Sequence, residues 1–347
     1  MECTIESSRP SFILRDLAKQ TDLESEEDCQ QLTLELAEQI GQGRIRSFDF
    51  QNGLGALVLD CTLREDLTIT FRGERPALVF MFNVCGEFWH QLDDDHIRYQ
   101  LNPLQGTITA NSSDSQQLFE FAANISLKAA AIVIDRTEYL ERVDCHVEEM
   151  AKPLTKVFED ITGQESFFYQ SNYSVAISDC INKILDNGYS GLAGSTYVEG
   201  KCLELLSRQL NQFQEDMKAP SKKVMLRQYD IESIQKAAKI MVDEMQDAPT
   251  IEKLATRVGL NRQKLKKGFK QVYDSTINEY LRNERLERAA ALILGEHNVE
   301  SAMHAVGYQN KSFFARKFEE RYGVLPGSYK KSIKDSGRYI IPPDQEE

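Results

Sequence analysis

The sequence lacks any long hydrophobic run. Across its 347 residues, no window approaches the roughly 18 uninterrupted apolar positions that a membrane-spanning helix needs. The first residues include acidic side chains and no continuous apolar stretch, which argues against a secretory leader. We therefore expect a cytoplasmic protein without a membrane partner.

Cysteine is scarce, and its spacing is irregular. No two cysteines form a C-x-x-C pair, and their number is odd. The seven residues are Cys3, Cys29, Cys61, Cys85, Cys145, Cys180 and Cys202. Such spacing does not describe a disulfide framework and fits a reducing compartment.

The sequence also lacks the short motifs of common enzyme classes. It has no Walker A loop, no G-x-S-x-G elbow and no dinucleotide-binding fingerprint. His90, Asp93, Asp94, Asp95 and His96 form a group with metal-ligand chemistry, but no third histidine follows at a suitable spacing. We interpret the aspartate run as the tip of a hairpin, and we predict no catalytic residue, no metal and no cofactor.

Positive charge is in deficit overall, with a net charge of -13, but the deficit is unevenly distributed. Residues 1–229 hold 21 lysines and arginines against 36 acidic residues, whereas residues 230–332 hold 18 against 14. Such asymmetry is typical of a nucleic-acid-binding domain attached to a second, acidic domain.

The acidic part begins with a predicted helix and continues with predicted strands. Residues 27–40 place Leu32, Leu34, Leu36 and Ile40 in a helix-friendly run. From residue 44, β-branched and aromatic runs recur at roughly ten-residue spacing, which predicts an antiparallel barrel or sandwich. The predicted strands are 55–61, 67–71, 77–84, 87–92, 97–101, 106–110, 117–122 and 128–134.

Helical periodicity returns after residue 136. The candidate helices are 137–143, 150–161, 171–185 and 196–215, and the last has an apolar face that suits dimerisation. A polar stretch from 216 to 228 with Pro220 then predicts a linker.

The basic part repeats one pattern twice. In the first copy, an apolar helix that starts near Ile251 ends at Gly259, and Asn261 caps a basic helix. In the second copy, a helix from Val299 precedes Gly307, and Asn310 caps the following helix. A short helix, a glycine turn and a second helix with charged outer positions indicate a helix-turn-helix reader of DNA.

The two copies are joined by a predicted helix over residues 275–294. At about 1.5 Å per residue it spans on the order of 30 Å, close to the roughly 34 Å of one DNA turn. One chain can therefore place two helices in successive major grooves.

The outward residues of the two second helices are the candidate DNA-binding residues. Cations suit phosphate groups, and Gln263 and Lys266 are placed to reach base edges. Lys267 and Arg316 occupy equivalent positions in the repeat. The full set is Arg262, Gln263, Lys266, Lys267, Lys270, Lys311, Ser312, Arg316 and Lys317.

Residues 232–331 resemble the DNA-binding domain of AraC/XylS-family transcription regulators. The matching residues are Leu254, Ala255, Val258, Gly259, Leu265, Phe269, Lys270, Tyr280, Arg285, Leu286, Ala289, Gly307, Tyr308, Phe314, Arg316, Lys317, Phe318, Gly323, Pro326 and Tyr329. Lys267 departs from the arginine usual in this family. The substitution removes a bidentate fork, so base preference there does not carry over.

The resemblance implies a sensor and dimerisation module in the acidic part, often a small cupin-like barrel. Residues 86–143 faintly resemble the siderophore-responsive members, which implies an iron-siderophore as one candidate effector. Phe80, Phe82, Phe88 and Trp89 are the candidate effector-binding residues, with ordinary core packing as the other interpretation.

We therefore predict an α+β protein with a cupin-like antiparallel β-barrel, a helical dimerisation segment and an all-α domain with two helix-turn-helix units. The segments are an N-terminal helical arm (1–43), a β-barrel sensor region (44–136), a helical dimerisation region (137–215), a linker (216–229), the DNA-binding domain (230–333) and a tail (334–347). The predicted function is a DNA-binding transcription activator whose effector is a small molecule. Its expected partners are double-stranded promoter DNA, a second copy of the chain and RNA polymerase. The alternative is a constitutive regulator whose N-terminal half only dimerises.

Overall fold

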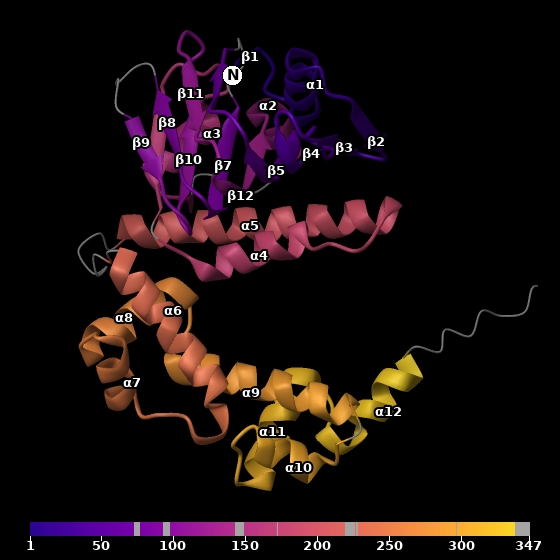
Figure 1. The fold of residues 1–347 in the computed structure, drawn as a ribbon, viewed down its shortest axis with the longest axis vertical. Coiled ribbons are helices and arrows are strands. Elements are labelled where there is room, and N and C mark those ends of the chain that lie inside the picture. Colours follow the sequence, from indigo (N-terminus) through magenta and orange to yellow (C-terminus); the bar gives the residue numbers. More distant parts are fainter. Residues whose placement is uncertain are drawn as a thin grey trace, which may run out of the picture. The chain divides into compact units, whose positions relative to one another are not determined.

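The computed structural model describes residues 1–72, 77–92, 98–142, 149–171, 173–218, 226, 228–295 and 297–336. It divides into two compact units, Met1–Lys222 and Lys223–Glu347 (Figure 1). The first unit is built mainly of strands and the second of helices, so the chain is an α+β protein. The predicted hairpin tip at Asp93–Asp95 and His96 lies outside the described residues.

The first unit contains two sheets. A five-stranded sheet has the order β1-β6-β11-β8-β9, and an eight-stranded sheet has the order β13-β10-β7-β12-β5-β4-β3-β2. The strands are β1 (Glu2–Ile5), β2 (Ser25–Asp28), β3 (Gln31–Glu35), β4 (Gly41–Asp49), β5 (Leu54–Leu63), β6 (Leu67–Phe71), β7 (Leu78–Cys85), β8 (Phe88–Leu92), β9 (Arg98–Leu101), β10 (Gly106–Ala110), β11 (Gln117–Phe121), β12 (Ser126–Ile134) and β13 (Phe167–Gln170).

The predicted β-barrel is not closed, because the described strands form two separate sheets. The two sheets face each other across a shared cavity, which is the sandwich that the strand spacing also allowed. The pairings are antiparallel apart from β1, which runs parallel to β6. The strand predictions from residue 55 onward agree with the structure to within one or two residues at most ends.

The predicted helix at 27–40 is wrong. This region forms β2 and β3, an antiparallel hairpin in which Leu32 and Leu34 are buried and Thr33 between them is half-buried. Leucines two residues apart share one face of a strand, so this spacing buries both leucines in a strand but not in a helix. The helix of this region lies earlier, at α1 (Pro10–Thr21), where a proline occupies the first turn.

Helices cover the outer face of the large sheet. They are α3 (Lys152–Glu159), α4 (Val175–Leu185) and α5 (Gly191–Lys218), and α2 (Arg136–Arg142) follows β12 and lies next to α3. The ring of Phe80 in β7 packs against Phe158 of α3 at 6.3 Å. Arg46 of β4 donates to the Ile184 carbonyl of α4 at 3.1 Å. Both faces of the central strands are therefore buried, one by helices and one by the small sheet.

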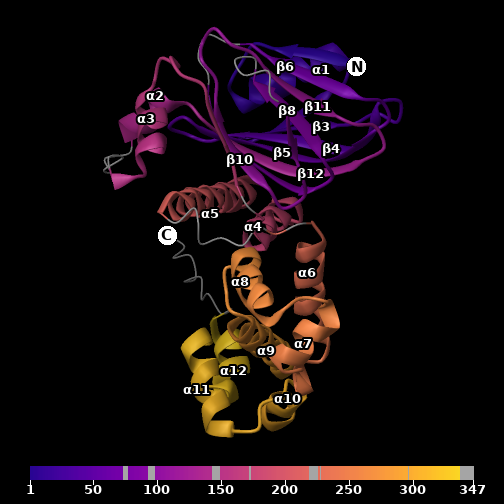
Figure 2. The same cartoon turned by 90° about the vertical axis from the view of Figure 1, so that its left-hand side faces the viewer.

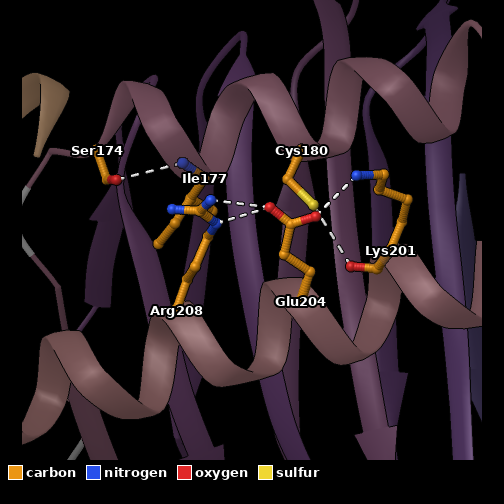
Figure 3. Close-up of polar contacts among 6 residues, drawn as sticks. All are labelled: Ser174, Ile177, Cys180, Lys201, Glu204 and Arg208. Carbon is orange, nitrogen blue, oxygen red and sulfur yellow. Dashed lines mark hydrogen bonds and ion pairs between the residues drawn. The ribbon is translucent and has the colours of Figure 1, made fainter. Parts of the chain in front are cut away.

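Helices α4 and α5 lie side by side (Figure 2). Figure 3 shows their polar contacts: Cys180 donates to the Lys201 carbonyl at 3.4 Å, and the Glu204 carboxylate bonds both Lys201 at 2.7 Å and Arg208 at 2.8 Å. The hydroxyl of Ser174 caps α4 by accepting from the Ile177 amide at 3.3 Å. These contacts fix the helix pair that ends the first unit.

The second unit contains seven α-helices in its described part. They are α6 (Gln228–Asp243), α7 (Ile251–Val258), α8 (Arg262–Tyr273), α9 (Ile277–Leu294), α10 (Val299–Ala305), α11 (Lys311–Tyr322) and α12 (Pro326–Ser336). A short 3-10 helix, η2 (Met245–Asp247), follows α6. None of the described helices of either unit is long and apolar enough to span a bilayer.

Candidate DNA-binding surface and effector cavity

Helices α7 and α8 form the first helix-turn-helix unit. The Thr250 hydroxyl caps α7, and the Asn261 carboxamide caps α8 by accepting from the Lys264 amide at 2.7 Å. Between them, Gly259 has φ 72°, a left-handed conformation that glycine adopts without a Cβ penalty. The predicted cap and turn of this unit are confirmed.

Helices α10 and α11 form the second unit in the same way. Asn298 caps α10 and Asn310 caps α11, with bonds of 2.7 Å and 2.9 Å to amides of the first turn. Gly307 has φ 87°, and a Cβ there would approach the Gln246 carbonyl oxygen to 2.5 Å. Glycine is therefore required at this turn for two independent reasons.

The two recognition helices, α8 and α11, bury equivalent positions. Leu265 and Phe269 of α8 are buried, as are Phe314 and Phe318 of α11. The apolar residues hold each helix against its unit and leave the opposite face to solvent. Arg262, Gln263, Lys266, Lys267 and Lys270 of α8 and Lys311, Ser312 and Arg316 of α11 are all exposed.

Lys267 and Arg316 are the matched pair of this surface. Each lies six residues after the capping asparagine of its helix, and each is exposed. The Arg316 guanidinium lies 5.5 Å from the Phe313 ring and its Nε lies 3.8 Å from Glu320. Because these neighbours are themselves exposed, the arginine remains accessible to a ligand.

The predicted cations differ in their ion pairs. Arg262 pairs with Glu252 at 2.9 Å, and Lys317 pairs with Glu320 at 2.5 Å. The Lys317 side chain is only 23% exposed. Of the predicted set, Lys266, Lys267, Lys270 and Lys311 form no ion pair within the described part of the chain. The first recognition helix therefore presents more unneutralised positive charge than the second.

Helix α6 fixes the position of the first recognition helix. Lys264 of α8 pairs with Asp230 of α6 at 2.6 Å, and the Asp230 carboxylate is only 5% exposed. A Cβ at Gly268 would lie 2.6 Å from Ile234 and 3.1 Å from Leu226. This close approach explains why a lysine of the basic helix faces inward and a glycine occupies its middle.

The long helix α9 joins the two helix-turn-helix units. Its 18 residues extend over about 27 Å, and Thr276 and Glu279 form a capping box at its start. Arg285 on this helix donates to the Met245 carbonyl at 2.9 Å, and its guanidinium lies 5.8 Å from the Tyr308 ring. Arg285 thus connects the segment before the first helix-turn-helix unit with the turn of the second helix-turn-helix unit.

The first unit of the chain contains a cavity of about 120 Å³ between its two sheets. Its walls are mainly apolar side chains from the facing surfaces of the sheets and from α1. They are Ile13, Leu14, Leu17, Ile45, Leu57, Leu59, Ile69, Phe71, Ala77, Val79, Met81, Phe119, Phe121, Ala131 and Val133. An apolar cavity with a few polar groups is typical of a small-molecule site.

Polar side chains gather at one end of this cavity. They are Glu6, Ser7, Ser8, Arg72, Asn111, Ser112, Ser115 and Gln117. The pairing of Ile5 with Phe71 and of Phe71 with Gln117 brings the ends of β1 and β6 to the start of β11. The cavity is therefore amphipathic, with an apolar interior and a polar end.

The four predicted effector-binding residues do not line this cavity. Phe80 and Phe82 are fully buried on the face of β7 that the helices cover, whereas the alternate residues Val79 and Met81 line the cavity. Phe88 packs against Phe121 at 5.2 Å, and the Trp89 ring lies 4.4 Å from the Arg98 guanidinium.

The sequence did not identify Val79 and Met81 as cavity-lining residues, because both faces of β7 are apolar. Alternation along the strand gives the two faces of β7 but not which one borders the cavity. The apolar spacing of Ile13, Leu14 and Leu17 was the available signal for the helical wall.

The buried thiols are poor candidates for redox chemistry. Burial raises the pKa of Cys61 to about 12 and that of Cys180 to about 11, and it also raises the pKa of Cys202. A thiol with a raised pKa holds little thiolate, which is the reactive form. These three cysteines therefore act as small core residues.

Sequence comparisons agree with this architecture. Residues 42–225, more than half of the chain, match the family model described as the regulatory protein PchR N-terminal domain, and residues 254–332 match a helix-turn-helix domain model. The regulatory protein PchR of Pseudomonas aeruginosa is 32% identical over 100 residues, which cover 29% of this chain and 33% of that protein. The HTH-type transcriptional regulator MtrA of Neisseria gonorrhoeae is 27% identical over 93 residues, covering 26% and 31%. The aligned region thus spans about a third of the length of each of these relatives.

Part of the chain also matches a solved structure. A transcriptional regulator with an AraC-type DNA-binding domain from Chromobacterium violaceum has 19% identity and a TM-score of 0.28, covering 29% of this chain and 92% of that one. With the doubled helix-turn-helix architecture and the two family matches, the chain belongs to the AraC family of DNA-binding transcription regulators, and within it to the group that carries the PchR N-terminal domain.

Proposed function

We propose that α8 and α11 read two successive major grooves of promoter DNA. The observation that carries this proposal is the matched position of Lys267 and Arg316 on two exposed, asparagine-capped helices. The length of α9, about 27 Å, suits two grooves that lie roughly one DNA turn apart. In this arrangement Gln263 and Ser312 reach base edges, and the remaining exposed lysines contact phosphates. We assign Lys266 to a phosphate, in place of the base edge expected from the sequence, because its ammonium is a point charge.

The test is binding to an operator obtained by selection from genomic fragments. We expect Lys267→Ala and Arg316→Ala each to weaken specific binding by about 1 to 3 kcal/mol. Lys239→Ala, an exposed lysine of α6 outside the recognition helices, is the matched control and should change little. Unchanged operator affinity in both variants would show that α8 and α11 are not the helices that read the operator.

We further propose that the cavity between the sheets binds a small effector that alters DNA binding. Its apolar walls and polar end support this role. Control by the effector requires that it bind the DNA-competent and incompetent states with different affinities. The alternative is a constitutive regulator in which the cavity stays empty and the first unit only dimerises.

A cavity-filling substitution separates these two functions. Ala131 of β12 lines the cavity and is buried, so Ala131→Leu reduces its volume. An effector found among small-molecule ligands should raise the melting temperature of the wild-type chain and shift its operator affinity, and Ala131→Leu should abolish both effects. If operator affinity stays constant with every stabilising ligand, the constitutive alternative holds.

We also propose that the regulator acts as a homodimer, through α5. Leu192 and Leu203 are 81% and 40% exposed on this helix, and eleven residues of separation place them on nearly the same face. Sedimentation should give a dimer for the wild-type chain and a shift toward monomer for Leu203→Glu. A monomeric wild-type chain would contradict the proposal.

As a transcription activator in the cytoplasm, the chain would contact RNA polymerase at its promoter. In vitro transcription from the selected operator tests this part of the proposal, since an activator raises transcript yield and a repressor lowers it.

A further inference from the structure

We propose that Phe313 of the second recognition helix contacts the C5-methyl group of a thymine in the major groove of the operator. This inference rests on the proposed DNA-reading role of α11. It deepens that role by naming a further base-contacting side chain and the chemical group that this side chain recognises. It also predicts that the two half-sites of the operator differ, because only the half-site of α11 is read through a thymine methyl.

Phe313 is an apolar side chain in an exposed position of α11. It is 41% exposed, although phenylalanine is among the residue types most often fully buried. Arg316 follows it by three residues, a spacing that places two side chains next to each other on a helix. The Arg316 guanidinium lies 5.5 Å from the centre of the Phe313 ring. Phe313 therefore lies beside the arginine that we propose as a reader of the operator.

The core of the second helix-turn-helix unit does not enclose this ring. Phe314 and Phe318, the neighbouring phenylalanines of α11, are fully buried and belong to the apolar core of the unit. Phe313 lies at the edge of that core, where its ring centroid is 6.2 Å from that of Tyr308. A large part of the ring remains in solvent, so core packing does not account for a phenylalanine at this position.

The first recognition helix places a different residue at the equivalent position. Lys264 lies three residues after the capping asparagine of α8, as Phe313 does on α11, and its ammonium pairs with Asp230 of α6 at 2.6 Å. Within α8, which the structure describes throughout, every exposed side chain is polar: Arg262, Gln263, Lys266, Lys267 and Lys270. Of the two recognition helices, α11 alone presents an exposed aromatic ring.

A thymine methyl is the group of the major groove that suits such a ring. Thymine presents its C5-methyl there, whereas the other bases present hydrogen-bond donors and acceptors. Contact between the ring and the methyl removes apolar surface of both partners from water, which is favourable in proportion to the area buried. An arginine can at the same time bond to the O6 and N7 atoms of a guanine. Phe313 and Arg316 together therefore suit a thymine close to a guanine.

Replacing single thymines of the selected operator by deoxyuridine removes the methyl group and keeps the base pairing. Each thymine is replaced in turn, and the affinity of the full-length chain is measured by fluorescence anisotropy. The guanines whose contacts Arg316→Ala weakens identify the half-site of α11. We expect a thymine in this half-site whose replacement lowers wild-type affinity about 4-fold, the value for one buried methyl-sized group. Replacements in the half-site of α8 should have little effect.

Variants of Phe313 show whether this side chain contacts the methyl. Phe313→Ala should bind the thymine operator less tightly than the wild-type chain and should no longer distinguish thymine from deoxyuridine at that position. Phe313→Leu keeps an apolar side chain and should retain part of the discrimination. Phe12→Ala is the matched control, because Phe12 of α1 is 47% exposed and the Arg15 guanidinium lies 5.7 Å from its ring. This control should keep the wild-type discrimination.

Three results overturn the inference. They are wild-type affinity that no deoxyuridine in the half-site of α11 changes, an operator without a thymine in that half-site, and discrimination that survives in Phe313→Ala. The first two hold even if Phe313→Ala fails to fold. In all three cases the proposed function stands as long as Lys267→Ala and Arg316→Ala weaken operator binding. If those two variants bind the operator normally, the proposed function and this inference are both overturned.

Discussion

Two lysines of the first recognition helix should govern much of the salt dependence of DNA binding. Lys266 and Lys270 are exposed on α8 and form no ion pair among the described residues. If each neutralises one phosphate, the double variant Lys266→Gln/Lys270→Gln loses two phosphate contacts. The slope of log K against log salt concentration should then become shallower by about 1.8, from roughly 0.9 per contact.

This change in slope corresponds to a measurable difference in affinity. Between 50 mM and 200 mM salt, a slope difference of about 1.8 amounts to about 12-fold in the relative loss of affinity. Fluorescence anisotropy with a labelled operator, repeated at four or more salt concentrations, gives both slopes. The loss should be the same on unrelated DNA, because phosphate contacts carry no sequence information.

A matched control distinguishes local contacts from net charge. Lys236→Gln/Lys239→Gln removes the same charge from exposed positions on α6, and its slope should stay at the wild-type value. A wild-type slope in the α8 double variant would show that Lys266 and Lys270 do not contact phosphates. An equal change of slope in both double variants would contradict local contacts as well, because the effect then reflects overall charge.

Two further predictions concern the stability of the C-terminal unit, Lys223–Glu347. Gly307→Ala should lower its free energy of unfolding by about 1 to 3 kcal/mol, since φ is 87° and the added Cβ meets a carbonyl oxygen; Gly295→Ala, where φ is -79°, should cost little in the same urea titration. Asp230→Asn should destabilise by about 1 to 3 kcal/mol, because it leaves the Lys264 ammonium without its buried carboxylate. Glu252→Gln removes an exposed ion pair and should change stability by less than about 1 kcal/mol. Equal effects of the Asp230 and Glu252 variants would contradict this ranking.

The second unit was predictable from sequence because its signals are local. Asn261 and Asn310 cap helices within three residues, and Gly259 and Gly307 adopt the left-handed turns that glycine favours. Helix caps and turns depend on neighbouring residues alone, so they can be predicted without knowledge of the tertiary structure. The inward orientation of Lys264 did not follow from sequence, since its partner lies on α6.

The N-terminal unit was less predictable because the central strands of its eight-stranded sheet are buried on both faces. Helix and strand periods competed over residues 27–40, where Leu32 and Leu34 obey the strand period. The aromatic residues Phe80 and Phe82 are conspicuous in the sequence, yet they pack under helices. The choice of face depends on long-range packing by α3, α4 and α5, which local sequence does not encode.

In the proposed complex, α8 and α11 occupy two successive major grooves. Guanine-methylation interference on the selected operator tests it directly, because the methyl group blocks contacts in the major groove. We expect two clusters of interference about 10 base pairs apart, with Lys267→Ala weakening one cluster and Arg316→Ala the other. A single cluster, or two clusters that respond identically to both variants, would contradict it.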